Sequence, residues 1–327
     1  MAELAGTTTT YDVGTAGGLR EDLEDVIWDL FPMETYCVSN FERTKAQATY
    51  HEWQTDLLAG ATANRQVEGN EFSASTIVAP TRMGNYCQIS KKEFLISGTM
   101  EAVSKAGRKS EIVRQGMKQM KELKRDMEQA LCGNQASSAG GQATARSCGG
   151  MESWIASTDN GGNGIRATTI ASSSTAGFTS GVVAAPTDGS STGAFTQTLL
   201  VDALGLAWAD GGNPTTILVN STQKAALDAF AGISSVTTEI GRKPATIVNA
   251  ARYFISDFGE HEVVLSRYVR SSVVLCVDPE YWAVAYLRAP FMETMAKTGD
   301  GEKRAIRTEF TLVARNPNAS AKVVACT

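Results

Sequence analysis

The side chains best suited to catalysis are scarce in this sequence. It holds only two histidines, His51 and His261, and neither lies beside a serine or cysteine nucleophile motif. Carboxylates are numerous, but no pair is singled out by its spacing. Because general acid–base and nucleophilic catalysis need such groups in combination, we expect no catalytic residue and no enzyme activity.

The cysteines are the next candidates for chemistry. There are six of them: Cys37, Cys87, Cys132, Cys148, Cys276 and Cys326. No two are spaced as Cys-x-x-Cys, and with so few histidines we expect no metal site. The chain opens with polar, Thr-rich residues and shows no secretory signal, so we expect reduced intracellular thiols that are buried as small apolar side chains.

Phosphate and calcium motifs are also lacking. Residues 161–164 read Gly-Gly-Asn-Gly, but no predicted strand precedes them and no predicted helix follows. Residues 159–164 begin like a calcium loop, yet the third position is glycine and the twelfth is Ile170 instead of glutamate. The sequence therefore predicts no cofactor.

Composition describes a folded chain without a nucleic-acid or membrane signature. The 327 residues are 43% hydrophobic and 20% charged, which suits one or two domains with a sizeable core. A net charge of −5 speaks against a general nucleic-acid binder, because such binding needs a clustered basic surface. No apolar run approaches 18 residues, so we expect no membrane span.

One long amphipathic helix is the clearest predicted element. Apolar residues recur three and four apart from Ser110 to Gly133, with Ser110 as the N-cap and Gly133 as a left-handed C-cap. The apolar stripe consists of Ile112, Val113, Met117, Met120, Leu123, Met127, Ala130 and Leu131. At 1.5 Å per residue the helix is about 35 Å long and can act as a spine, although the core helix of an ordinary α+β protein would read the same way.

An N-terminal arm precedes it. Residues 1–18 lack periodicity, and residues 19–30 predict a short acidic amphipathic helix stopped by Pro32. Because the long helix is rich in lysine and arginine, we hypothesise that the arm lies against a spine, its own or that of a neighbour. The alternative is a solvated acidic face that contributes little energy.

An extended loop follows the arm. Strands are expected at 42–57, 76–78 and 86–97, and the stretch between the first two, residues 58–75, holds few apolar residues, among them Val67 and Phe72. A two-stranded ribbon is marginal in water, so we expect it to be ordered by another subunit. A surface loop that folds back onto its own domain is the alternative.

The second half changes character. Residues 134–150 are rich in Ala, Ser and Gly, residues 151–155 form a short apolar island, and residues 157–193 are almost wholly Gly, Ser, Thr, Ala and Asn. A flexible linker or insertion and a small-residue β element packed on a neighbour both fit this composition, and we favour a surface-exposed insertion. From Phe195 a mixed α+β unit begins, with helices at 199–208 and 221–230. Its strands are expected at 216–219, 245–256, 262–268, 273–277, 282–287, 306–314 and 321–325. This order is not the alternating βαβ of a Rossmann enzyme.

Taken together, this order of segments resembles the major capsid proteins of tailed bacteriophages, with the HK97-like fold. The more specific stretches are 51–56 (HEWQTD), 98–126, 257–259, 278–282, 286–288 and 297–300. The resemblance implies an α+β chain divided into an N-terminal arm (1–42), an E-loop with peripheral-domain strands (43–97), a peripheral domain with the spine helix (98–155), the insertion (156–194) and an axial domain whose last strands return to the peripheral domain (195–327).

The function that the resemblance implies is mechanical. Copies of the chain would form pentamers and hexamers of an icosahedral virion shell, assembled in the host cytoplasm, around double-stranded DNA that is bound without sequence specificity. Scaffold, portal and decoration proteins are the implied partners. Residues 46–90 hold no lysine, so a lysine-based covalent cross-link from the loop is not expected. An encapsulin-type compartment and a secreted carbohydrate-binding β protein remain alternatives.

Assembly contacts are expected at aromatic and basic side chains. The five tryptophans (Trp28, Trp53, Trp154, Trp208 and Trp282) are expected to be core or interface anchors. The residues expected at interfaces between copies are Trp28, Trp53, Phe72, Arg114, Lys118, Lys121 and Arg125.

Overall fold

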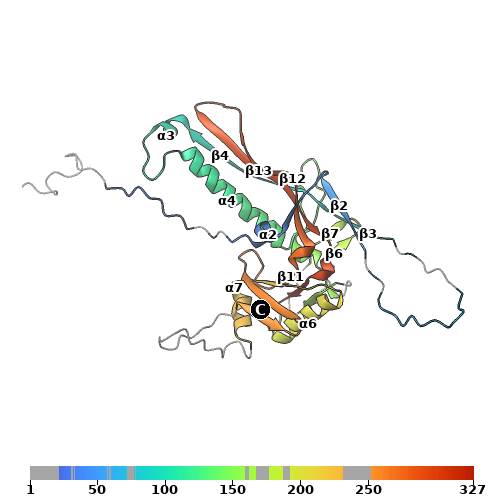
Figure 1. Cartoon of the computed structure of the whole chain (residues 1–327). Helices are drawn as coiled ribbons and strands as arrows, with labels where there is room; N and C mark the ends of the chain where they lie inside the picture. Colours follow the sequence, from blue (N-terminus) through green and yellow to red (C-terminus); the bar gives the residue numbers. More distant parts are fainter. Residues whose placement is uncertain are drawn as a thin grey trace, which may run out of the picture.

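Two main β-sheets and one long helix dominate the structure (Figure 1), a computed structural model. It describes residues 22–30, 32, 34–56, 58, 60–71, 77, 79–158, 162–166, 177–186, 192–230 and 252–327. The mixture of helices with mixed parallel and antiparallel sheets confirms the predicted α+β class. Among the described residues, no helix is both long and apolar enough to cross a bilayer.

The spine helix is α4, Glu111–Cys132. Ser110 caps it as predicted, since its hydroxyl accepts a hydrogen bond from the backbone N–H of Val113 at 3.3 Å. The predicted left-handed cap at Gly133 is wrong: its φ is −77°, and the chain leaves the helix in an extended conformation. The stripe is buried at Ile112 and again from Leu123 onward, whereas Val113 and Met117 between them stay 58% and 59% exposed.

The helix lies along a four-stranded sheet of order β1-β12-β13-β4 (Figure 1). Its strands are β1 (Glu42–Lys45), β12 (Trp282–Thr294), β13 (Gly301–Ala314) and β4 (Gln88–Ser97), and α3 (Gly98–Ala102) follows β4. Both strands of the β12–β13 hairpin extend beyond the predicted 282–287 and 306–314, because the added part of β13 carries polar residues such as Lys303 and Arg304 that show no strand-like apolar alternation. Register shifts near Arg288 bend this hairpin.

The second sheet has six strands in the order β5-β14-β11-β8-β10-β9. These are β5 (Gly164–Arg166), β14 (Ala321–Val324), β11 (Val274–Val277), β8 (Thr216–Val219), β10 (Gly259–Leu265) and β9 (Tyr253–Ser256). Helices α6 (Gln197–Ala209) and α7 (Ser221–Asp228) contribute Leu200, Leu204 and Leu227 to its core. Two short 3-10 turns, η3 (Pro279–Tyr281) and η4 (Pro317–Ala319), connect the last strands.

The Gly-rich region is not a surface insertion where the structure describes it. β5 belongs to the six-stranded sheet, and the hairpin β6 (Gly177–Thr179) and β7 (Val182–Ala184) packs on α5 (Met151–Trp154). Phe178 stacks on Trp154 at 5.6 Å between ring centroids, and Val183 is buried. The expectation of surface exposure is wrong because small residues let backbones approach closely here; a Cβ on Gly149 would lie 2.8 Å from Val183.

The extended loop has its own ribbon, β2 (Tyr50–Thr55) paired with β3 (Thr81–Tyr86). The expected strand at 76–78 is not seen at Ile77, and its flanking residues lie outside the described part of the chain. The expected acidic helix is wrong for residues 22–30, which have no helical turn; their apolar side chains find little to pack against, and Leu30 is 97% exposed. The arm reaches the body at α2, Tyr36–Asn40.

Candidate functional site

The two histidines form no catalytic arrangement among the described residues. His261 is buried, with Nδ1 at 2.5 Å from the Pro214 carbonyl and Nε2 at 2.8 Å from Ser256 Oγ. Both ring nitrogens are therefore occupied in structural bonds, and burial lowers the pKa of this imidazole. His51 lies on β2 beside Trp53, at 6.0 Å between ring centroids.

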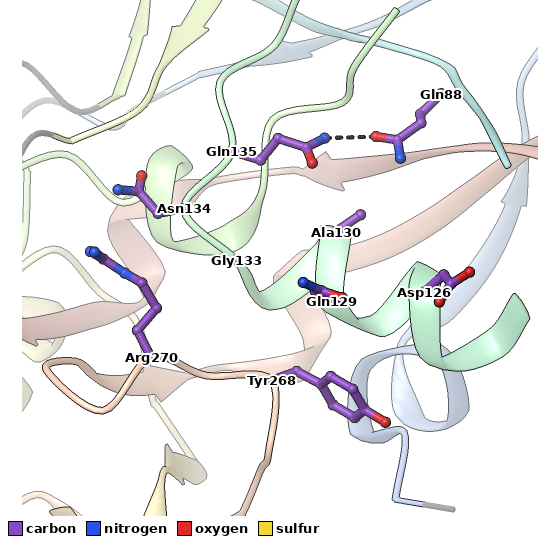
Figure 2. Close-up of a pocket in the computed structure, with 9 residues that line it drawn as sticks. All are labelled: Gln88, Asp126, Gln129, Ala130, Gly133, Asn134, Gln135, Tyr268 and Arg270. Carbon is purple, nitrogen blue, oxygen red and sulfur yellow. Dashed lines mark hydrogen bonds between the residues drawn. The ribbon is translucent and has the colours of Figure 1, made fainter. Parts of the chain in front are cut away.

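A polar pocket of about 430 Å³ lies between the C-terminal half of α4 and the loop after β10 (Figure 2). It is lined by Gln88, Asp126, Gln129, Ala130, Gly133, Asn134, Gln135, Tyr268 and Arg270. Its polar groups already bind protein partners: Gln135 donates to Gln88 at 2.6 Å, Asp126 pairs with Lys92 at 2.7 Å, and Arg270 pairs with Glu152. This pocket joins two parts of the fold and has no nucleophile with an adjacent base.

One cluster brings together three potential metal-binding atoms. Cys37 Sγ, Cys132 Sγ and a Glu128 carboxylate oxygen all lie within 4.8 Å of one another, and all three residues are buried. The sequence indicates only part of this cluster. Glu128 and Cys132 are one helical turn apart, but Cys37 is distant in the chain, so nothing in the sequence places it beside them. Burial of all six cysteines, as predicted, is confirmed.

Buried ion pairs hold the base of the hairpin. The carboxylate of Glu309 is buried and contacts Arg146 at 2.5 Å and Arg288 at 2.9 Å. Two guanidinium groups on one buried carboxylate tie β13 to the Gly-rich loop and to β12. No spacing in the sequence points to this cluster, since its members are far apart in the chain.

The loop beyond the β2–β3 ribbon projects from the body (Figure 1). Residues 60–71 are all exposed, and so are the apolar side chains of Leu58, Val67 and Ile77 at 100%, 81% and 92%. Phe72, one of the expected interface residues, lies outside the described residues. Such a segment has too little apolar contact with its own chain to be held there.

The base of the ribbon is anchored on its own chain. Trp53 is partly buried and packs on Trp154, at 5.4 Å between ring centroids. Tyr50 donates to the Gly181 carbonyl at 2.8 Å. The ribbon is therefore anchored at Tyr50 and Trp53, whereas Glu52, Gln54 and the tip are exposed to solvent.

The arm touches the start of its own spine helix. Asp25 Oδ1 accepts from the Gly107 N–H at 3.2 Å, and Asp29 lies 3.7 Å from the Arg114 guanidinium. Trp28, another expected interface residue, is 81% exposed and donates only to Glu24, at 3.4 Å. The arm thus meets a spine as hypothesised, and the spine is its own.

The other expected interface residues lie along α4. Lys118 is 4.0 Å from Glu122, and Arg125 donates to the Tyr268 hydroxyl at 3.1 Å on the pocket side. Lys121 also has an interaction within the chain. The six of these residues that the structure describes do not form one patch, and the interface role of all seven stays a prediction.

Comparisons with known proteins give one consistent result. Residues 4–327 match the family model described as SU10 major capsid protein. A curated relative, the "Major capsid protein" of Escherichia phage Phieco32, is 27% identical over 328 residues, covering 89% of this chain and 90% of the relative.

Solved structures agree at the level of the fold. The "Cyanophage A-1(L) capsid asymmetric unit" matches with a TM-score of 0.66 and 13% identity, over 98% of this chain and 100% of the other. The "Capsid structure of the Cyanophage P-SCSP1u" matches with a TM-score of 0.62 and 11% identity, over 99% and 97%. "Phage G gp27 major capsid proteins and gp26 decoration proteins" matches with a TM-score of 0.53 and 11% identity, over all of both chains. The expected HK97-like fold is confirmed.

Proposed function

Because this chain belongs to the family of SU10 major capsid proteins, we propose how its surfaces build a phage capsid shell. The protein is a phage major capsid protein with a shell-forming role, and its place is the virion capsid. Its work is mechanical: many modest contacts, repeated by symmetry, make a closed and stable container.

The loop over residues 56–80 is proposed to lie on a neighbouring copy. The observation that carries this proposal is the exposure of Leu58, Val67 and Ile77 on a segment that projects away from its own core. Apolar side chains left in water on an extended loop are typical of a surface that is covered in an assembly. The neighbour would supply the ordering energy that the loop's own contacts do not.

The remaining expectations are proposals that build on the family. We propose that the six-stranded sheet and its helices form the axial domain at five-fold and six-fold axes, and that the spine helix and four-stranded sheet form the peripheral domain. We propose that the chain is divided into five segments, with boundaries after residues 42, 97, 155 and 194. Assembly takes place in the host cytoplasm, with scaffold and portal proteins supplied separately.

We also propose that the shell encloses double-stranded DNA without sequence-specific contacts and is completed by decoration proteins. The net charge of −5 suits a wall from which DNA can be released. The Phage G structure names decoration proteins beside its capsid proteins. This chain, without a loop lysine between Lys45 and Lys91, would rely on non-covalent contacts or on a decoration protein.

Electron microscopy of the purified chain tests the loop contact. Wild type is expected to give shells or capsomer rings, whereas deletion of residues 58–75 leaves a folded, soluble subunit without closed particles. A milder variant, Leu58→Ser with Val67→Ser and Ile77→Ser, should lower particle yield at least tenfold. The matched control, Ala61→Ser with Ala63→Ser, changes equally exposed positions with little apolar area and should assemble like wild type. Normal yield from the deletion would contradict the loop contact.

A further inference from the structure

The buried cluster of Cys37, Glu128 and Cys132 joins the end of the N-terminal arm to the spine helix. The carboxylate of Glu128 accepts the backbone N–H groups of Cys37 at 2.8 Å and Val38 at 2.9 Å, so it holds the first turn of α2 against α4. These two bonds and the packing of Phe41 fix a helix of only five residues. The cysteine side chains therefore meet because Glu128 docks one helix on the other.

The two thiols are in contact in this arrangement. Cys37 Sγ lies 3.1 Å from Cys132 Sγ, and Cys132 Sγ lies 3.6 Å from Glu128 Oε1. No other described cysteine pair has its sulfur atoms in a hydrogen-bonded contact. We propose that Cys37 and Cys132 are a disulfide-forming pair that locks α2 onto the spine after the protein leaves the reducing cytosol.

The chemistry needs a small disulfide, such as oxidised glutathione, as the oxidant. When α2 opens, the Cys37 thiol loses its proton to water, and the thiolate attacks the small disulfide, giving a mixed disulfide and one small thiolate. Cys132 then loses its proton to water, and its thiolate attacks the Cys37 sulfur, closing the protein disulfide and releasing the second small thiolate. Two protein thiols are oxidised, one small disulfide is reduced, and the small thiolates take up both protons.

The closed cluster protects the thiols. Burial raises the pKa of Cys37 well above its ordinary value, and the nearby Glu128 carboxylate adds to this effect. A protonated, shielded thiol is unreactive, so oxidation must wait for local opening of α2. The pair should thus stay reduced during assembly and oxidise slowly afterwards.

A metal site explains the cluster less well. Two thiolates on one zinc ion stand roughly 3.7 Å apart in tetrahedral geometry, which is wider than the 3.1 Å seen here. Two thiolates, one carboxylate and one divalent cation would also leave a net negative charge in a fully buried place, whereas a disulfide is neutral. Metal binding is therefore an outcome of the test and not the proposal.

The cross-link would have a mechanical effect on the subunit. It would close the chain from residue 37 to residue 132, a span that contains the whole extended loop and the strands at its base. Closing so long a segment stabilises the folded state by restricting the unfolded chain. The proposal rests on the proposed capsid function, so the cross-link would stabilise the released particle, which meets an oxidising medium.

Thiol counting on the full chain tests the proposal. Assembled wild type is incubated with reduced or oxidised glutathione, then denatured, alkylated and analysed by mass spectrometry. The oxidised sample should lose two of its six alkylatable thiols, show a Cys37–Cys132 linked peptide, and melt about 5 °C higher than the reduced sample. Retention of all six thiols, under conditions that oxidise the unfolded chain, would overturn the proposal. So would a stoichiometric metal ion released together with these two thiols.

Variants separate the cross-link from general effects. Cys37→Ala and Cys132→Ala should each abolish the difference in melting temperature between the oxidised and reduced samples, whereas Cys326→Ala, which removes a buried cysteine outside the cluster, should keep it. Glu128→Gln should speed oxidation severalfold, because α2 opens more often without its carboxylate. If shells form normally but Cys37 and Cys132 never oxidise, the cross-link is wrong and the proposed function stands. If no shells form under any condition, the result counts against the proposed function.

Discussion

At the residue scale, several buried charged groups in this protein are held by ion pairs or hydrogen bonds. Glu309 takes two arginines, Glu152 takes Arg270, and the Lys322 ammonium donates to the backbone carbonyl of Glu152 at 2.6 Å. Burying a charge is costly unless it is paired, so removing one partner leaves the other uncompensated. These groups are therefore expected to be sensitive to single substitutions.

Glu309→Gln should destabilise the subunit by about 2 kcal/mol, because two guanidinium groups would face a neutral amide in a largely buried place. The estimate is at the low end for a broken buried pair, since Arg288 is partly exposed. Urea unfolding of the dissociated subunit measures it. The control Glu302→Gln breaks a more exposed pair with Arg304 and should cost about 0.5 kcal/mol or less. If Glu309→Gln and Glu302→Gln lowered the free energy of unfolding equally, the expected extra cost of breaking the buried pair would be contradicted.

His261 should make the subunit less stable in acid. Burial lowers its folded-state pKa below the ordinary 6.5, so between the two values the unfolded chain binds a proton that the folded chain does not. Its contribution is complete above about pH 6.5 and is lost as the pH falls through the lowered folded-state value. Urea unfolding at pH 7 and pH 5 should show this slope, and His261→Gln should flatten it. An unchanged slope in the variant would show that other groups carry the effect.

At the scale of elements, the segments differ sharply in what holds them. The two sheets and the second half of α4 form continuous apolar cores, whereas residues 22–30 meet the body only near Gly107 and Arg114. Exposed ion pairs contribute little, so the arm is held weakly by its own chain. An element of this kind is suited to exchange its contacts for those of a neighbour.

Weakening the arm contacts should loosen the arm without unfolding the body. Asp25→Ala combined with Asp29→Ala removes the bond to Gly107 and the contact with Arg114, and it leaves the Arg114–Glu111 pair in place. We expect limited proteolysis within residues 22–35 to become about threefold faster or more, with the global free energy of unfolding changed by less than about 1 kcal/mol. Asp22→Ala, on the same exposed segment, is the control and should leave the rate unchanged. A cleavage rate equal to wild type in the double variant would contradict arm docking.

At the scale of the whole molecule, the fold is a rigid body with projecting segments. Figure 1 shows the loop after β2 and the arm leaving the body in different directions. In the proposed shell the loop would reach another copy, and the sum of many such contacts would make the shell stable although each is weak. A wall with this purpose needs no strong affinity for its contents.

The isolated subunit should therefore bind duplex DNA only weakly. With a net charge of −5, its dissociation constant at physiological salt is expected to be weaker than about 10⁻⁴ M. Fluorescence anisotropy with a labelled duplex measures it. Micromolar binding that weakens steeply with added salt would contradict the proposal that the wall holds DNA without specific contacts.

Local patterns were enough for the strongest elements of this fold. The spine helix from Ser110, the strand Thr216–Val219 and the overall α+β class follow from apolar periodicity and capping, which depend on neighbouring residues alone. The polar loop at 60–71 also followed from the sequence, because a segment with few apolar residues cannot bury itself.

Tertiary structure decided the rest, because it depends on which distant segments meet. The composition around residues 164–166 and 177–184 favours a surface-exposed insertion, yet these residues form a strand of the six-stranded sheet and a hairpin packed on α5. The arm residues 22–30 have helical periodicity, yet they have no surface on which to bury it. Glu309 with its two arginines, and Cys37 with Cys132, become visible only after folding, since partners far apart in the chain leave no spacing to read.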